Sequence, residues 1–246
     1  MRMNVPAEPG AGELRPLSAR SVVLSLLLGA HPPRLPVKDL VDLVAPFGVG
    51  GSTLRAALSR MVAAGDLRRA DGVYGLSDRL LARQRRQDDA VDPAARAWRG
   101  DWEMLVVTAT GRGPAERADL RARLTGLRLA ERREGVWLRP ANLDRALPDD
   151  LRATADLYTA RPAEPPRELA ARLWPLDAWA ATARSLLAVA ARAGTPADRL
   201  TAYAASVRHL LTDPVLPAAL LPAHWPGEAL RAAYAEYRRE LARALG

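Results

Sequence analysis

Apolar residues recur at helical spacing in three successive segments near the start of the chain, residues 18–29, 37–45 and 53–64. Residues 67–76 follow with a different pattern, which predicts two short strands joined by an Asp71-Gly72 turn. Three helices followed by a hairpin is the order of a winged helix-turn-helix. We therefore expect a winged helix at this end of the chain.

The middle of the chain alternates strand and helix patterns. The predicted elements are a strand at 104–108, a helix at 114–124, a strand pair at 127–138, a helix at 147–155 and a strand at 157–159. This βαββαβ order is the ferredoxin-like arrangement. From Trp174 onward the pattern is helical, and Thr195 can cap one of these helices with Pro196 at its first position.

These patterns predict an α+β fold that is mostly helical, with an N-terminal winged helix-turn-helix, a central ferredoxin-like α/β domain and a helical C-terminal domain. The expected divisions are a flexible tail at 1–16, the winged-helix domain at 17–78, a linker helix at 79–97, the ferredoxin-like domain at 98–170 and the C-terminal domain at 171–246.

The charge balance favours a polyanionic partner. The sequence has 36 basic and 28 acidic residues, a formal charge of +8, and Lys38 is its only lysine. Neutralising phosphates with arginine releases counterions, so double-stranded DNA is the expected partner. The sequence contains no cysteine, which excludes disulfides and thiolate metal sites. It also has no apolar run of the roughly 20 residues that a spanning helix needs, so we expect a cytoplasmic protein with no membrane partner.

The third helix of a helix-turn-helix enters the major groove with its outer face. With Leu54, Leu58 and Met61 turned inward, small and basic residues occupy the opposite face. Arginine can bond bidentately to guanine, and serine, threonine and alanine can contact phosphates, bases or a thymine methyl. The candidate DNA-binding residues on this helix and the following hairpin are Thr53, Arg55, Ala56, Ser59, Arg60, Arg68 and Arg69.

The alternative for this helix is a solvated face with ordinary surface arginines. A second group of arginines follows at Arg79, Arg83, Arg85 and Arg86. For that group a solvated helix face and a second contact with phosphates are both open.

The sequence resembles the PaaX family, the repressors of phenylacetate catabolism, in three places along the chain. The matching stretches near the start are Leu43-Val44-Ala45-Pro46-Phe47-Gly48 and Leu54-Arg55-Ala56-Ala57-Leu58-Ser59-Arg60-Met61. In the middle they are Trp98-Arg99-Gly100-Asp101-Trp102, Arg121 to Leu124 and Gly135-Val136-Trp137-Leu138-Arg139-Pro140. Near the end they are Asp213-Pro214-Val215-Leu216-Pro217, Leu220-Leu221-Pro222 and Trp225-Pro226-Gly227.

The resemblance implies a winged helix, a central domain similar to Cas2 and a helical C-terminal domain. It further implies a homodimer that binds palindromic operators and is released by an acyl-CoA thioester such as phenylacetyl-CoA. Two features depart from the family. The wing lacks the arginine that usually follows the turn glycine, so its phosphate contact is expected to move to Arg68 or Arg69, and the segment from Thr195 to Asp213 is short. The residues that bind an effector are left unassigned.

Two other functions are open. One is an effector-independent DNA-binding or architectural protein. The other is a Cas2-like metal-dependent nuclease, which needs a carboxylate at the end of the first central strand. That strand ends in Val106-Val107-Thr108-Ala109-Thr110-Gly111, without Asp or Glu, so an enzyme is not expected. The three histidines, His31, His209 and His224, do not form a ligand set, so neither a metal nor a cofactor is expected.

Overall fold

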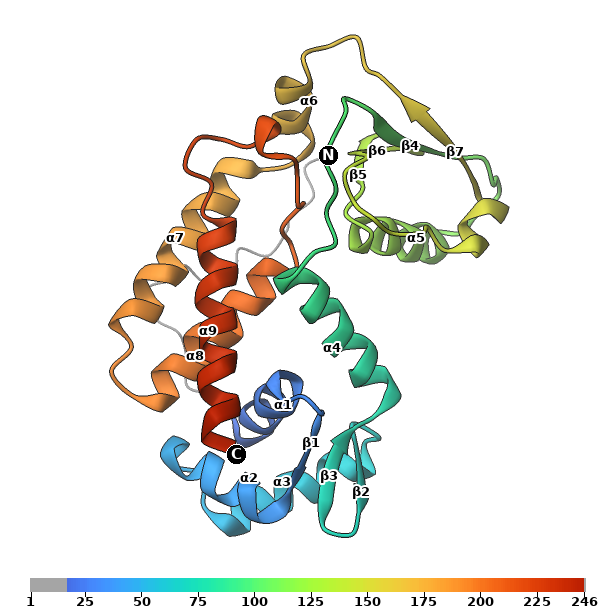
Figure 1. Ribbon diagram of the computed structural model, residues 1–246. Coiled ribbons are helices and arrows are strands. Elements are labelled where there is room, and N and C mark those ends of the chain that lie inside the picture. Colours follow the sequence, from blue (N-terminus) through green and yellow to red (C-terminus); the bar gives the residue numbers. More distant parts are fainter. Residues whose placement is uncertain (1–16, 246) are drawn as a thin grey trace. The chain divides into compact units, whose positions relative to one another are not determined.

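The computed structural model describes residues 17–245, and the predicted tail at 1–16 lies outside the described residues. The chain forms two compact units (Figure 1). The first unit comprises Met1–Asp92, Ala181–Leu211 and Pro226–Gly246, and the second comprises Pro93–Ala180 and Thr212–Trp225.

The first unit begins with the predicted winged helix. Its elements are α1 (Ala19–Gly29), β1 (Arg34–Pro36), α2 (Val37–Val44), the 3₁₀ turn η1 (Ala45–Phe47), α3 (Gly51–Ala63), β2 (Leu67–Ala70) and β3 (Val73–Leu76). The hairpin turns at Asp71 and Gly72, which both have positive φ, as this two-residue turn requires. Strand β1 was not predicted, because three residues that include a proline carry no alternating pattern. It pairs with β3 and completes a three-stranded wing.

The inner face of α3 is buried as the apolar spacing predicted. Leu54, Leu58 and Met61 are at most 1% exposed, and they pack in one core with the apolar residues of α1. The third helix is therefore fixed by its own buried face, and its opposite face is left toward solvent.

Three further helices belong to this unit: α4 (Asp78–Val91), α8 (Pro196–Leu210) and α9 (Gly227–Leu245), together with the end of α7 (Leu176–Arg192). The Thr195 hydroxyl accepts a hydrogen bond from the Asp198 amide at 3.1 Å, which confirms the predicted cap of α8. Leu200 of α8 and Leu241 of α9 pack on the core of the winged helix. The core of the DNA-binding fold is thus continuous with the C-terminal helices.

The second unit is built on a four-stranded antiparallel sheet in the order β5-β6-β4-β7. Its elements are β4 (Trp102–Val107), α5 (Pro114–Gly126), β5 (Ala130–Arg133), β6 (Val136–Pro140), the 3₁₀ turn η2 (Asp149–Ala153), β7 (Ala155–Ala160) and α6 (Pro166–Leu173). The strand order is that of a ferredoxin-like fold. The helix predicted at 147–155 is only this 3₁₀ turn, because Ala155 already pairs with Val107 in the sheet.

Tryptophans and a buried arginine form the interior of the second unit. Trp102 is fully buried, and Trp179 stacks on Trp225 with ring centroids 4.6 Å apart. Arg139 is also fully buried, and its guanidinium donates to the Asn142 side-chain oxygen at 2.8 Å. Burial lowers the pKa of Arg139 to about 9. These residues have a structural role in the unit.

Candidate DNA-binding surface

The outer face of α3 presents the predicted side chains together. Thr53, Arg55, Ala56, Ser59 and Arg60 are all exposed. They share one side of the helix because the leucines and methionine of the opposite side are held in the core. Folding therefore leaves these side chains free to reach a groove or a phosphate, and their contact with DNA stays a prediction.

Arg55 and Arg60 have no acidic partner in the part of the chain that the structure describes. Within residues 17–245, no carboxylate lies within ion-pair distance of either guanidinium. An arginine without an internal partner keeps all its donors for an external acceptor. This is the arrangement that reading guanine or holding a phosphate requires.

The two arginines of the wing, Arg68 and Arg69, are neighbours on β2 and so point to opposite faces of the hairpin. Both are exposed. Arg68 is ion-paired with Asp78, at the beginning of α4. Arg69 lies over the Tyr74 ring, with its guanidinium carbon 5.8 Å from the ring centroid. Of these two arginines, therefore, only Arg69 has a charge that no carboxylate among the described residues offsets.

A buried carboxylate fixes the wing and α3 to the rest of the winged helix. Asp66 follows α3 directly, and its side chain is 3% exposed. It accepts hydrogen bonds from Arg20 of α1, at 2.6 Å, and from Arg79 of α4. The Ser77 amide donates to the Asp66 carbonyl at 3.0 Å, which closes the base of the hairpin. This role could not be predicted from the sequence, because a lone aspartate after Gly65 is ordinary in a turn.

The arginines of α4 have separate environments. Arg79 is paired with Asp66, and Arg83 is half-buried. Arg85 and Arg86 are exposed. The sequence left two alternatives open for this group, a solvated helix face and a second contact with phosphates. Neither alternative describes all four residues.

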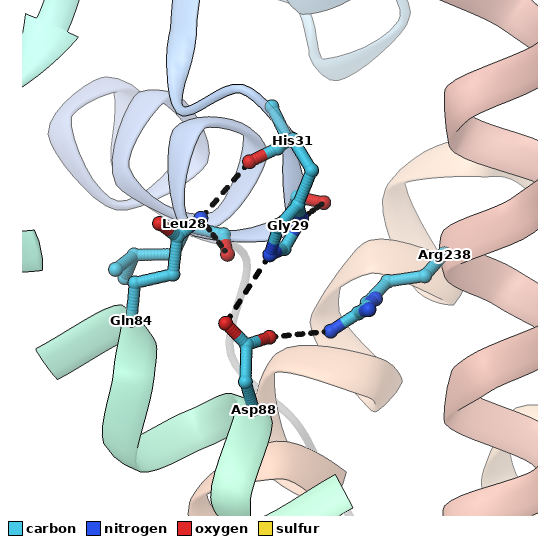
Figure 2. A network of polar contacts seen from close by, with 7 residues as sticks. Leu28, Gly29, His31, Gln84, Asp88 and Arg238 are labelled. Carbon is cyan, nitrogen blue, oxygen red and sulfur yellow. Dashed lines mark hydrogen bonds and ion pairs between the residues drawn. The ribbon is translucent and has the colours of Figure 1, made fainter. Parts of the chain in front are cut away.

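A second polar network joins α1, α4 and α9 (Figure 2). The Gln84 amide of α4 donates to the carbonyls of Leu28 and Ala30 at 3.1 and 2.9 Å, which satisfies the end of α1. Asp88 lies one turn further along α4. It accepts from Arg238 of α9 at 2.6 Å and lies 3.2 Å from a ring nitrogen of His31. Helix α4 thus connects the winged helix to the C-terminal helix within this unit.

Three helices, a three-stranded wing and an outer helix face with unpaired arginines define a winged-helix protein of the DNA-binding class. Comparison with protein families identifies the same class of protein. The chain belongs to the PaaX family: the family models described as PaaX-like protein, PaaX protein central Cas2-like domain and PaaX-like protein C-terminal domain match residues 18–80, 95–161 and 174–245. This family is one of DNA-binding transcriptional regulators.

A solved structure is similar to this one over nearly the whole chain. The uncharacterized protein Rv0674 from Mycobacterium tuberculosis is 52% identical, with a TM-score of 0.81, over 92% of this chain and 97% of that one. No protein with a curated description matches the chain.

No cluster of three or more His, Cys, Asp or Glu side chains suited to a metal ion occurs among residues 17–245. Over the same residues, no helix has the length and apolar character needed to cross a membrane.

Proposed function

We propose that this chain is a repressor whose homodimer binds a palindromic operator and releases it when an acyl-CoA thioester such as phenylacetyl-CoA binds. The observation that carries the proposal is the outer face of α3, where Arg55 and Arg60 are exposed and have no carboxylate partner among residues 17–245. Membership of the PaaX family supports the regulatory role.

In the proposed complex, α3 lies in the major groove. Arg55 and Arg60 donate to guanine edges, while Thr53 and Ser59 hydrogen-bond to bases or phosphates. Ala56 is small enough to contact a thymine methyl. The wing lies along the backbone, where Arg69 neutralises a phosphate and Arg68 can do so when it leaves Asp78.

A palindromic operator requires a two-fold symmetric protein, whose two recognition helices are separated by about one helical turn of DNA, roughly 34–36 Å. Strand β7 supports self-association, because it is an edge strand of its sheet. It also carries the exposed large apolar side chains Leu157 and Tyr158, which are 44% and 48% exposed.

An effector that weakens operator binding about 100-fold must prefer the non-binding conformation by about 3 kcal/mol. The experiment is fluorescence anisotropy on a duplex from the region upstream of the gene, at fixed salt, with a shuffled duplex of equal length as control. Phenylacetyl-CoA and free coenzyme A are then titrated into the complex.

Tight binding to the natural duplex alone, abolished by phenylacetyl-CoA and not by coenzyme A, is the expected result. Specific binding that no acyl-CoA affects would support an effector-independent DNA-binding protein in its place. Equal affinity for natural and shuffled duplexes, across the candidate promoters, would contradict a sequence-specific repressor.

A further inference from the structure

A pocket of about 140 Å³ lies among four helices of the first unit. Its walls come from α1, α4, α8 and α9, so residues far apart in the sequence enclose it. All of these helices belong to the same unit as the wing and α3. A ligand in this pocket would therefore contact the helices that support the DNA-binding surface directly.

Part of the pocket lining is apolar and aromatic, and the rest is polar. Leucines and valine alternate in the lining with three tyrosines, of which Tyr203 and Tyr237 are stacked with centroids 4.3 Å apart. Burial raises the pKa of Tyr234 to about 12, so its hydroxyl stays protonated and can donate a hydrogen bond. A benzene ring fits a cavity of roughly 150 Å³, so the volume of this pocket suits an aryl or short acyl group placed against its apolar and aromatic side chains.

The charged residues of the lining are all arginines: Arg20, Arg83, Arg208 and Arg238. Two of them have internal partners, since Arg20 pairs with Asp66 and Arg238 with Asp88. Arg83 of α4 and Arg208 of α8 have no carboxylate partner among residues 17–245.

Arg83 and Arg208 line the same pocket, so their like charges oppose each other there. Burial lowers the pKa of Arg83, and the charge of Arg208 lowers it further, ahead of the smaller effects of Arg86, Arg20 and Arg79. The Arg83 guanidinium nevertheless remains charged at neutral pH. Arg83 is half-buried and Arg208 is exposed, so an anion held between them would offset a repulsion that burial increases at Arg83.

We propose that this pocket binds a small ligand in which an aryl or short acyl group carries an anionic group, with the apolar part among the tyrosines and the anion between Arg83 and Arg208. The guanidinium forks can hold a carboxylate or phosphate through paired hydrogen bonds. This assignment rests on the proposed regulatory function only in taking the ligand to be the effector, since binding itself needs no DNA.

The pocket also has a direct connection to the winged helix. Leu28, Gly29 and Arg238 line it, and the same residues take part in the network of Figure 2. A ligand that draws Arg83 and Arg208 together would change the packing of α4 against α8. Because α4 holds the end of α1 through Gln84, that change would reach the winged helix.

The test is isothermal titration calorimetry on the DNA-free, full-length protein. Three probes are used: phenylacetate, phenylacetyl-CoA and coenzyme A. Arg83→Gln and Arg208→Gln are compared with Arg85→Gln, which removes an exposed arginine from the same helix. Ala204→Phe fills the apolar part of the pocket and leaves the arginines in place. Thermal unfolding confirms that each variant is folded.

We expect phenylacetate or phenylacetyl-CoA to bind the wild type, and each pocket arginine variant to weaken binding by roughly 10- to 100-fold. Ala204→Phe should weaken binding as well, and Arg85→Gln should leave it unchanged. Binding of phenylacetate identifies a free acid as the ligand, and binding of the thioester alone places the anion on the coenzyme A part.

Absence of binding by both aryl probes, or binding that neither arginine variant weakens, would overturn the proposal. So would variants that lower the affinity for DNA without ligand and leave ligand binding intact, because the arginines would then contact phosphate. Ligand binding at the pocket with no effect on operator affinity keeps the site and rejects only the effector-controlled repressor.

Discussion

Helices α3 and α4 both carry several arginines, yet their structures give these arginines different environments. On α3, Arg55 and Arg60 are exposed and have no carboxylate partner within residues 17–245. On α4, Arg79 is held by buried Asp66 and Arg83 lines a pocket, while Arg85 and Arg86 are exposed like the arginines of α3. An arginine already paired inside the protein fixes the fold, and an unpaired one is available to a ligand. The internal partner of Arg79 therefore separates it from Arg55 and Arg60, whereas Arg85 differs from these two only in the helix that carries it.

The largest effect is expected when the buried side of α3 is altered. Leu58 is fully buried in the core, so Leu58→Ala should lower the free energy of unfolding by about 2–5 kcal/mol through the cavity it leaves. Urea denaturation measures this. Ser59→Ala, at the exposed neighbouring position, should change stability by no more than about 0.5 kcal/mol. Similar losses of stability in the two variants would contradict the division of α3 into a buried face and an exposed face.

The next effect concerns the exposed side of the same helix. Arg55→Ala and Arg60→Ala should each weaken operator binding by about 1–3 kcal/mol, with stability unchanged, if the side chain bonds to a base. Anisotropy on operator and shuffled duplexes measures this. Arg85→Ala on α4 is the matched control. It should weaken binding to both duplexes equally, or leave binding to both unchanged. An equal loss on both duplexes for Arg55→Ala would assign that residue to a phosphate.

These two helices also explain what sequence reasoning could and could not find. The faces of α3 were predictable because the spacing of Leu54, Leu58 and Met61 is local and helical. Ion pairs are not local: Arg20 reaches Asp66 across 46 residues, and nothing in the spacing indicates it. The pocket arginines, Arg83 and Arg208, are brought together only by the packing of α4 and α8.

The same distinction applies to secondary structure. Residues 147–155 have helix-forming composition, yet the sheet requires Ala155 as a strand residue, which leaves only a 3₁₀ turn. Strand β1 exists because Leu35 pairs with Tyr74, an interaction that its own three residues do not encode. Long periodic segments were therefore predicted well, and short elements that depend on distant partners were not.

A third prediction concerns the ion pairs that hold α1 and α4 at the wing. Asp66→Asn keeps the shape of the side chain and removes its charge, so it should lower stability by about 1–2 kcal/mol. The loss is moderate because Arg20 and Arg79 are each more than half exposed, which screens their attraction to Asp66. Thermal unfolding at low and high salt measures it. Asp89→Asn, at an exposed position of α4, should have no comparable effect.

The smallest effect distinguishes the two wing arginines. Arg68 is ion-paired with Asp78, so Asp78→Asn should release its charge and strengthen DNA binding by roughly 2- to 5-fold. The slope of log affinity against log salt should steepen by about 0.9, as one more phosphate is neutralised. Asp89→Asn removes the same charge from α4 away from this pair and serves as control. An equal gain in both variants would reflect net charge alone, and it would leave Arg69 as the arginine through which the wing contacts phosphate.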